Sequence, residues 1–365
     1  MADITVSTTI DDFMQAADAD AAKAVLNIVA GGGGGTVQGT DGTYDIKAVA
    51  VNDNGYPLSV NGENSVNLQT TSFGAATMVA SGNASVISGG SSNTASGGNA
   101  VVGGGFSNTA SGAYSSTVGG GQGNIASSNY TTVGGGMENN VSSVNGIIGG
   151  GFSNTVSGGT SNTVGGGSGN SATGSYYGEG NAIVSGGKNN TASGHDSTIS
   201  GGSDNTASGY KTTISGGYNN TSSIYATTIG GGGANIASLD YSTVGGGNTN
   251  TASGYYSTVS GGYLGTASGD YSTISGGYGN AAAVSNSTVG GGKENTASGD
   301  YSAVLGGRNN STNSLADAMI AGSQITAQRA NTLHCNNLTI KNIPTSAAGL
   351  TAGDVWNDAG TLKIV

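Results

Sequence analysis

Residues 198–209 read TISGGSDNTASG, and close variants of this string recur along most of the chain. With the β-branched residue of each TVGGG or TISGG string as position 0, the sequence contains fifteen anchors. The anchors are Ile87, Val102, Val118, Val133, Ile148, Val164, Val184, Ile199, Ile214, Ile229, Val244, Val259, Ile274, Val289 and Val304. Of the fourteen intervals, eleven are 15 residues long, two are 16 and one is 20. Self-similarity at a fixed period predicts a repeat fold, with the extra residues as surface bulges.

Each repeat has its own internal pattern. Glycine occupies positions +2 and +3 in all fifteen copies, and asparagine occupies +6 in fourteen, with Gly265 as the exception. Two adjacent glycines predict a turn whose φ values or close backbone approach exclude a Cβ. Period-two alternation places Ser/Thr at +13, Val/Ile at 0 and Gly at +2 on one face of a strand, and Asn at +6, Ala at +8 and Gly at +10 on one face of a second strand. Each repeat is therefore predicted to contain two short strands and two turns.

This pattern predicts which side chains build the interior. The expected central core residues are Val184, Ile199, Ile214, Ile229, Val244, Val259, Ile274 and Val289. Inward asparagines would bond from one coil to the next through their side-chain amides, which satisfies buried polar groups without charge. The expected ladder residues are Asn190, Asn205, Asn220, Asn235, Asn250, Asn280 and Asn295.

The predicted architecture is an all-β, parallel β-solenoid, or β-roll, with a 15-residue repeat. Coils stacked at roughly 4.8 Å give a rod about 70 Å long. The small inward residues provide little apolar burial against the entropy of ordering so much glycine, so a single rod is expected to be marginal. Three identical rods with closed cyclic symmetry would bury a second surface, which predicts a homotrimer.

The non-repetitive ends divide the chain into four expected regions. Residues 1–35 are predicted to form a short self-associating helix with a heptad seam, followed by a glycine hinge. Residues 36–80 alternate like strands and predict a small β adaptor. The solenoid is expected over 81–318, and residues 319–365 are expected to form a C-terminal β cap with a strand, turn and strand around 358–360.

Composition excludes several function classes. The chain of 365 residues contains 72 glycines, has a net charge of -11 and carries only nine Lys and Arg residues, which argues against a nucleic-acid partner. No stretch of about 18 apolar residues and no secretion signal is apparent, so neither membrane insertion nor standard export is expected. Cys335 is the single cysteine and has no partner for a disulfide or a zinc site. His195 and His334 have no partnered nucleophile, so we expect no enzyme activity, no metal and no cofactor.

Tyrosine is the second periodic feature, and it recurs at the outward position +12. Tyr241, Tyr256, Tyr271 and Tyr301 are the candidate glycan contacts, because exposed aromatic faces stack on sugars. The alternative is that stacked tyrosines shield a strand edge or a subunit groove. Outward threonines at +7 and +14 also suggest an ice-binding face, but a T-x-T motif within one strand is absent and tyrosine interrupts the face.

The S-T-V-x-G-G and N-T-A-S-G strings resemble the head repeats of YadA-like trimeric autotransporter adhesins, over about 220 residues. That family has left-handed parallel β-rolls with a 14-residue repeat, so the resemblance implies a trimeric β-roll. The present chain differs by one residue in its period and has Asn where the family more often has Ala.

The two ends resemble another class. Residues 8–26, TTIDDFMQAADADAAKAVL, resemble the virion-proximal start of phage tail-fibre proteins, and residues 342–365 are similar to C-terminal segments of phage structural proteins. This resemblance implies a virion fibre assembled in the host cytoplasm, with its N-terminus on tail or baseplate proteins and its rod reaching a host-surface glycan. The alternatives are a bacterial trimeric surface adhesin, an extracellular filament protein, or a capsid decoration fibre without receptor binding.

Overall fold

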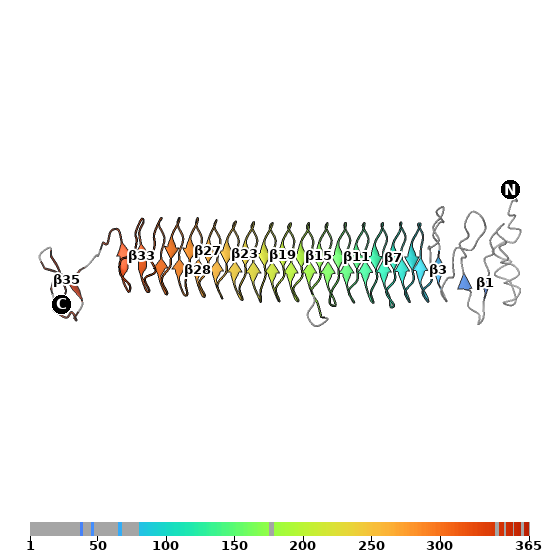
Figure 1. Cartoon of the computed structure of the whole chain (residues 1–365), viewed down its shortest axis with the longest axis horizontal. Coiled ribbons are helices and arrows are strands. Elements are labelled where there is room, and N and C mark those ends of the chain that lie inside the picture. The colour runs from blue at the N-terminus through green and yellow to red at the C-terminus, as the bar shows by residue number, and fades with distance from the viewer. Residues whose placement is uncertain are drawn as a thin grey trace.

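The chain folds as a long stack of short parallel strands (Figure 1). The structure is a computed structural model, and it describes residues 37–38, 45–46, 65–67, 80–174, 179–339, 343–346, 348–352, 354–358 and 361–364. All secondary structure in these residues is β, with no helix, which confirms the predicted all-β solenoid. The expected N-terminal helix and glycine hinge lie outside the described residues, as does most of the expected β adaptor.

One parallel sheet, here called the anchor sheet, carries the position 0 residues. It has eighteen strands, and each pairs with the equivalent strand of the next coil so that Ile199 stands beside Ile214. Its strands are β3 (Val66–Asn67), β4 (Val86–Ile87), β6 (Val101–Val102), β8 (Thr117–Val118), β10 (Thr132–Val133), β12 (Ile147–Ile148), β14 (Thr163–Val164), β16 (Ile183–Val184), β18 (Thr198–Ile199), β20 (Thr213–Ile214), β22 (Thr228–Ile229), β24 (Thr243–Val244), β26 (Thr258–Val259), β28 (Thr273–Ile274), β30 (Thr288–Val289), β32 (Ala303–Val304), β33 (Met319–Ala321) and β34 (Leu333–Cys335).

A second parallel sheet of fourteen strands, here called the alanine sheet, carries positions +7 and +8. Its register is equally regular, with Ala192 beside Ala207. Its strands are β5 (Thr94–Ala95), β7 (Thr109–Ala110), β9 (Ile125–Ala126), β11 (Asn140–Val141), β13 (Thr155–Val156), β15 (Ser171–Ala172), β17 (Thr191–Ala192), β19 (Thr206–Ala207), β21 (Thr221–Ser222), β23 (Ile236–Ala237), β25 (Thr251–Ala252), β27 (Thr266–Ala267), β29 (Ala281–Ala282) and β31 (Thr296–Ala297).

The core is a thin layer between the two sheets. In each coil the second residue of the anchor strand and the second residue of the alanine strand are buried, as Ile199 and Ala207 are. All eight residues expected in the central core have no exposed surface. Since the strands are two residues long, one residue points inward and one outward, which is the alternation expected of a β-strand.

The two glycines of each repeat have different roles. At position +3, φ lies in the left-handed region, +90° at Gly202, and a Cβ there would overlap the carbonyl oxygen of Gly217 in the next coil. At position +2 a Cβ on Gly201 would meet nothing within 4 Å. The inward position expected for the +2 glycine is therefore wrong, because its side-chain direction opens to solvent, whereas the +3 glycine is fixed by both φ and close approach.

The anchor sheet extends beyond the repeats recognised by sequence. β3 joins it at one end, within the segment expected as an adaptor, and β33 and β34 continue it past residue 318. Ile320 is fully buried and pairs with Val304, so it acts as a further anchor without the double glycine. Two hairpins form separate sheets: β1 (Val37–Gln38) pairs with β2 (Asp45–Ile46), and β35 (Val355–Asp358) pairs with β36 (Thr361–Ile364). β35 and β36 are the two strands expected in the C-terminal cap, and the residues of the expected turn at 359–360 lie outside the described residues.

Candidate functional site

The asparagine ladder runs along the inside of the turn that leads from the anchor sheet to the alanine sheet. The Asn205 Nδ2 donates to the carbonyl oxygens of Gly201 at 3.2 Å and Gly217 at 2.9 Å. Its Oδ1 accepts from the backbone N–H of Asn220 at 3.0 Å and from the Asn220 Nδ2 at 3.0 Å. One buried amide therefore closes its own turn and binds the next coil, and its Oδ1 provides the acceptor for the buried backbone N–H of Asn220.

All seven asparagines expected in the ladder are buried and donate to the glycine carbonyls of their own and the next coil. Gly265 interrupts the series. Its backbone N–H still donates to the Asn250 Oδ1 at 2.8 Å, but it has no amide to pass the interaction to the next coil. Because the ladder is uncharged and enclosed, its chemistry is structural.

A column of stacked rings, here called the aromatic column, follows the opposite turn over six consecutive coils. Its members are His195, Tyr210, Tyr225, Tyr241, Tyr256 and Tyr271, with neighbouring ring centroids 4.6 to 5.4 Å apart. Four of the five ring pairs are nearly parallel, with interplanar angles of 14° or less, and the Tyr225 and Tyr241 pair is T-shaped at 69°. Both arrangements lie in the favourable range for aromatic pairs.

Stacking decides which ring faces can contact a ligand. Tyr256 has a parallel neighbour on each side, and Tyr241 lies between Tyr256 and the T-shaped Tyr225. Tyr271 has one stacked neighbour, Tyr256, because the next coil carries Asn286 in place of a ring. Tyr301 is 65% exposed, and no ring stacks on it within the part of the chain described by the structure. Of the four candidate glycan contacts, only Tyr271 and Tyr301 therefore present a ring face outward.

The backbone under these tyrosines is unfavourable for a bulky residue. Tyr241, Tyr256, Tyr271 and Tyr301 have φ between 53° and 59°, in the left-handed region. This region costs an ordinary L-residue about 1–2 kcal/mol, and Asn or Asp occupies it more readily. Asn286 stands at the equivalent position of another coil. Tyrosine is therefore not required by the backbone here, and at Tyr241, Tyr256 and Tyr271 the ring contacts are the compensating interaction.

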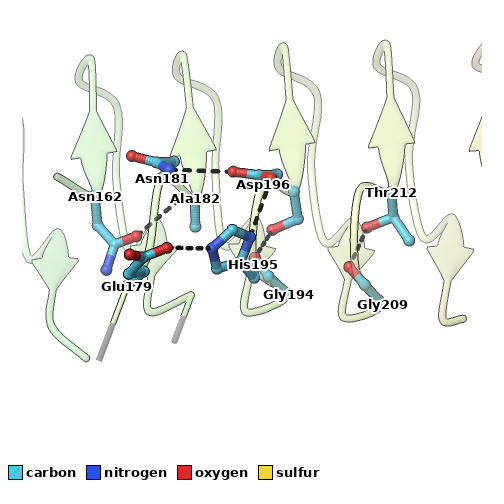
Figure 2. A network of polar contacts seen from close by, with 10 residues as sticks. Asn162, Glu179, Asn181, Ala182, Gly194, His195, Asp196, Gly209 and Thr212 are labelled. Carbon is cyan, nitrogen blue, oxygen red and sulfur yellow. Dashed lines mark hydrogen bonds and ion pairs between the residues drawn. The ribbon is translucent and has the colours of Figure 1, made fainter. Parts of the chain in front are cut away.

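Figure 2 shows how the first ring of the column is held. His195 is 9% exposed, and its Nδ1 lies 3.1 Å from the Asp196 Oδ2, while its Nε2 lies 3.8 Å from the Glu179 Oε2. The second Asp196 oxygen, Oδ1, accepts from the Asn181 Nδ2 at 3.1 Å. The nearly buried imidazole thus bridges two carboxylates, one of which comes from the 20-residue coil.

The same region explains how the longest repeat keeps its register. The Asn162 Oδ1 accepts from the backbone N–H of Ala182 at 2.8 Å, across a separation of 20 residues (Figure 2). The Asn162 Nδ2 also donates to the carbonyls of Ser157 and Gly174. An inward asparagine at a position usually held by Ser or Thr therefore closes the base of the insertion, and the neighbouring coils stay in register.

One phenol of the column has a perturbed acidity. Partial desolvation against its neighbours, followed by the electrostatic effect and hydrogen bond of Tyr225, raises the pKa of Tyr241 above its ordinary value. Both causes oppose placing a negative charge inside a stack of rings. Ionisation of the Tyr241 phenol within the stack is therefore disfavoured.

Three column members were not predicted from the sequence, because they stand outside the +12 position at which tyrosine recurs. His195, Tyr210 and Tyr225 stand at +11, and the column shifts to +12 at Tyr241. The signal was present as aromatic residues spaced by 15, 15, 16, 15 and 15 residues from 195 to 271. Of the remaining tyrosines at +12, Tyr114 and Tyr130 are exposed and lie 6.3 Å apart, and Tyr176 lies outside the described residues.

The described residues contain no constellation typical of a metal site. No group of three His, Cys, Asp or Glu side chains in this part of the chain is placed to hold a metal ion. A bilayer-spanning helix is likewise not found among the residues that the structure describes. His334 and Cys335 stand in the last anchor strand, where the His334 Nε2 contacts the Arg329 carbonyl at 3.1 Å and Cys335 is half-buried.

Comparison with known proteins gives no further identification: no protein-family model matches the chain, and no curated protein resembles it significantly.

Proposed function

We propose that this chain is a structural fibre of a virion, a tail fibre or spike, that works as a homotrimeric spacer and host-surface adhesin. The observation that supports this best is the continuous parallel pairing of the anchor strands from β4 to β34. About sixteen coils at roughly 4.8 Å per coil give a rod of 70–80 Å. From β4 to β31 the coils are bonded through both sheets, and the asparagine ladder joins all of them except at Gly265, so the element resists bending and separates its two ends.

The surface of the rod favours adhesion over catalysis. The inward asparagines form hydrogen bonds within the scaffold, and exposed aromatic residues lie on its edges. Tyr271 and Tyr301 present ring faces that suit stacking on the apolar face of a sugar. A neutral or weakly charged host glycan is therefore the proposed receptor, and the enclosed tyrosines of the column support the rod.

Immuno-electron microscopy tests the assignment to a virion. Antibodies against the rod are expected to label fibres on virus particles released from the source culture. Labelling of the envelope of uninfected cells would instead support a bacterial adhesin or filament protein. Labelling of capsids, without any effect of the antibody on adsorption, would support a capsid decoration fibre.

Binding to host cells tests the adhesive surface. The double variant Tyr271→Ala and Tyr301→Ala is expected to lower binding of the purified full chain to host cells at least tenfold. The matched variant Tyr218→Ala and Tyr263→Ala removes two exposed rings at position +4 from the same half of the rod and is expected to retain binding. Equal binding by wild type and the Tyr271/Tyr301 variant would refute the glycan contact and leave the spacer role intact.

A further inference from the structure

Charge is distributed unevenly along the rod. Residues 81–178 contain a single charged side chain, Glu138, whereas residues 179–339 contain eight acidic and five basic side chains. Residues 179–339 therefore carry a net charge of -3 and residues 81–178 a net charge of -1, so repulsion between copies is weaker in the first half of the rod. The uncharged half is the part of the rod where copies can approach closely.

The uncharged half also exposes apolar residues along one edge. We call the turn that leads from the anchor sheet to the alanine sheet the first edge. Phe106, Gln122, Met137 and Phe152 form one column on it, joined by consecutive parallel bridges. The three apolar members are 41–49% exposed. Protein interfaces are enriched in aromatic residues and Met and depleted of charge at their centre, which is the composition of this column.

The return turn, which we call the second edge, carries a complementary pair of rings at the same height. Tyr114 and Tyr130 are 58% and 56% exposed and follow the coils that contain Phe106 and Gln122. Phe106 and Tyr114 therefore lie in one coil and Gln122 and Tyr130 in the next, so the two edges face each other at equal height in these two coils. Cyclic symmetry around the rod axis keeps equivalent coils of parallel copies at equal height, and a heterologous contact that closes joins two different surfaces.

We propose that the first edge of one copy packs against the second edge of the next copy over residues 98–152, with the chains parallel and in register. The occupant is a second copy of this chain, because it has the same repeat along its axis and carries only one charged side chain, Glu138, in this half. The inference rests on the self-association proposed above and assigns it a surface. In this register Phe106 lies at the height of Tyr114 and Gln122 at the height of Tyr130. Met137 and Phe152 face the return turns of the following two coils, at Asn145 and Thr160, and the contact buries their apolar side chains there.

The other half of the first edge provides the matched control. Tyr218 and Tyr263 occupy the same position +4 and are similarly exposed, but Lys188, Lys293 and Arg308 share their column. The Lys293 ammonium lies over the Tyr278 ring, 5.3 Å from its centroid, so cations already occupy this surface. We therefore expect the charged half of this edge to face solvent.

The first experiment measures the mass of the full chain by light scattering after gel filtration, over a hundredfold range of concentration. The wild type is expected to be an oligomer. The Phe106→Ser and Phe152→Ser double variant is expected to dissociate at concentrations at least tenfold higher, whereas Tyr218→Ser and Tyr263→Ser in the charged half are expected to leave the mass unchanged. Circular dichroism confirms that each variant retains its β-structure.

The outcomes separate this inference from the proposed function. A monomeric wild type would overturn both the self-association and its assigned surface, while immuno-labelling of virions would be unaffected. An oligomer that resists Phe106→Ser and Phe152→Ser, or that depends equally on Tyr218 and Tyr263, would overturn only the assigned surface.

Cysteine cross-linking tests the geometry directly, in a Cys335→Ser background. Gln122→Cys on the first edge and Tyr130→Cys on the second edge lie at opposite edges of the rod, so one chain cannot join them to each other. The double variant is expected to form covalent oligomers on oxidation, and each single variant is expected to stay monomeric on a denaturing gel. Efficient cross-linking by Gln122→Cys alone would show that two first edges meet and would overturn the arrangement.

Discussion

The two halves of the rod share a scaffold and differ at their edges. Residues 81–174 and residues 179–320 both have buried anchors, a +3 glycine with positive φ and an asparagine ladder. The first half exposes Phe, Met and Tyr almost without charge, whereas the second has charged turns and the aromatic column. Only a few positions of each repeat therefore determine the solenoid, and the exposed turn residues can vary between the halves. We infer that the turns of the first half mediate self-association and that those of the second half contact the host surface.

The largest expected loss of stability comes from removing ladder asparagines, and comparing the two halves tests whether both depend equally on the ladder. Replacing Asn205, Asn220 and Asn235 together by Ala leaves the buried backbone N–H groups of residues 220, 235 and 250 without their Oδ1 acceptors. We expect a cost of about 1–3 kcal/mol per site, seen as a large fall in the thermal midpoint by circular dichroism. The same change at Asn108, Asn124 and Asn139 is expected to cost as much. An unchanged midpoint in either half would contradict a common scaffold.

The next effect distinguishes the two glycines of the turn in both halves. Gly202→Ala places a Cβ against the carbonyl of Gly217 in a left-handed conformation, so we expect a loss above about 2 kcal/mol. Gly136→Ala in the first half is expected to match it, since its Cβ would meet the carbonyl of Gly151. Urea unfolding measures both. The control Gly201→Ala meets no neighbour and is expected to change stability by less than about 0.5 kcal/mol; a similar loss in this control would refute the distinction.

A smaller loss of stability is expected when a ring is removed from the aromatic column, and it should exceed the loss from the Tyr114 and Tyr130 pair of the first half. Tyr256→Ala removes two stacked contacts, with Tyr241 at 4.6 Å and Tyr271 at 5.2 Å, and is expected to cost about 1–2 kcal/mol. Tyr130→Ala loses one contact at 6.3 Å and is expected to cost about 0.5 kcal/mol or less. Denaturant midpoints of the two variants test the difference. Equal losses would mean that stacking in the column does not stabilise the rod.

The smallest expected change in stability comes from placing an asparagine at Gly265, where the ladder is interrupted. This interruption lies in the second half of the rod, and the first half has no equivalent. Gly265→Asn is expected to stabilise the chain by about 1 kcal/mol, since the new amide restores the contacts made in the other coils. The added Cβ lies 3.1 Å from the Asn250 Oδ1 and 3.3 Å from the Val259 Cγ1, so these neighbours must shift slightly. The thermal midpoint is the measurement. Gly265→Ala is the control without an amide, and a higher midpoint for Ala than for Asn would contradict the role of the amide.

Much of the fold could be predicted from the sequence, because the repeat aligns equivalent residues. The buried Ile199 and Ala207 and the inward Asn205 follow from alternation of side chains along a strand. Alternation was misleading at Gly201, since a turn begins there and the backbone no longer alternates like a strand. The anchor strands β33 and β34 were missed because they keep the register without the glycine pattern.

The candidate site was less predictable, for a physical reason. The sequence shows that Tyr241, Tyr256, Tyr271 and Tyr301 face outward, but it cannot show whether a neighbouring ring covers each face. That depends on the rise between coils and on ring orientation, and the rings stack within 5.4 Å in the column while Tyr301 stands apart. A shift of one residue along the turn, from +11 to +12, also hid the continuity of the column.

The register of the parallel sheets has a consequence for how such a chain changes in length. Every coil offers its neighbours the same strand pairing, with Ile199 beside Ile214 and Ile214 beside Ile229, so each coil is interchangeable as a structural unit. A tandem duplication of one 15-residue unit in the gene would insert a complete coil without disturbing either neighbour. The length of the rod can thus change in steps of about 4.8 Å, while the apolar edge of the first half and the aromatic column of the second half stay intact.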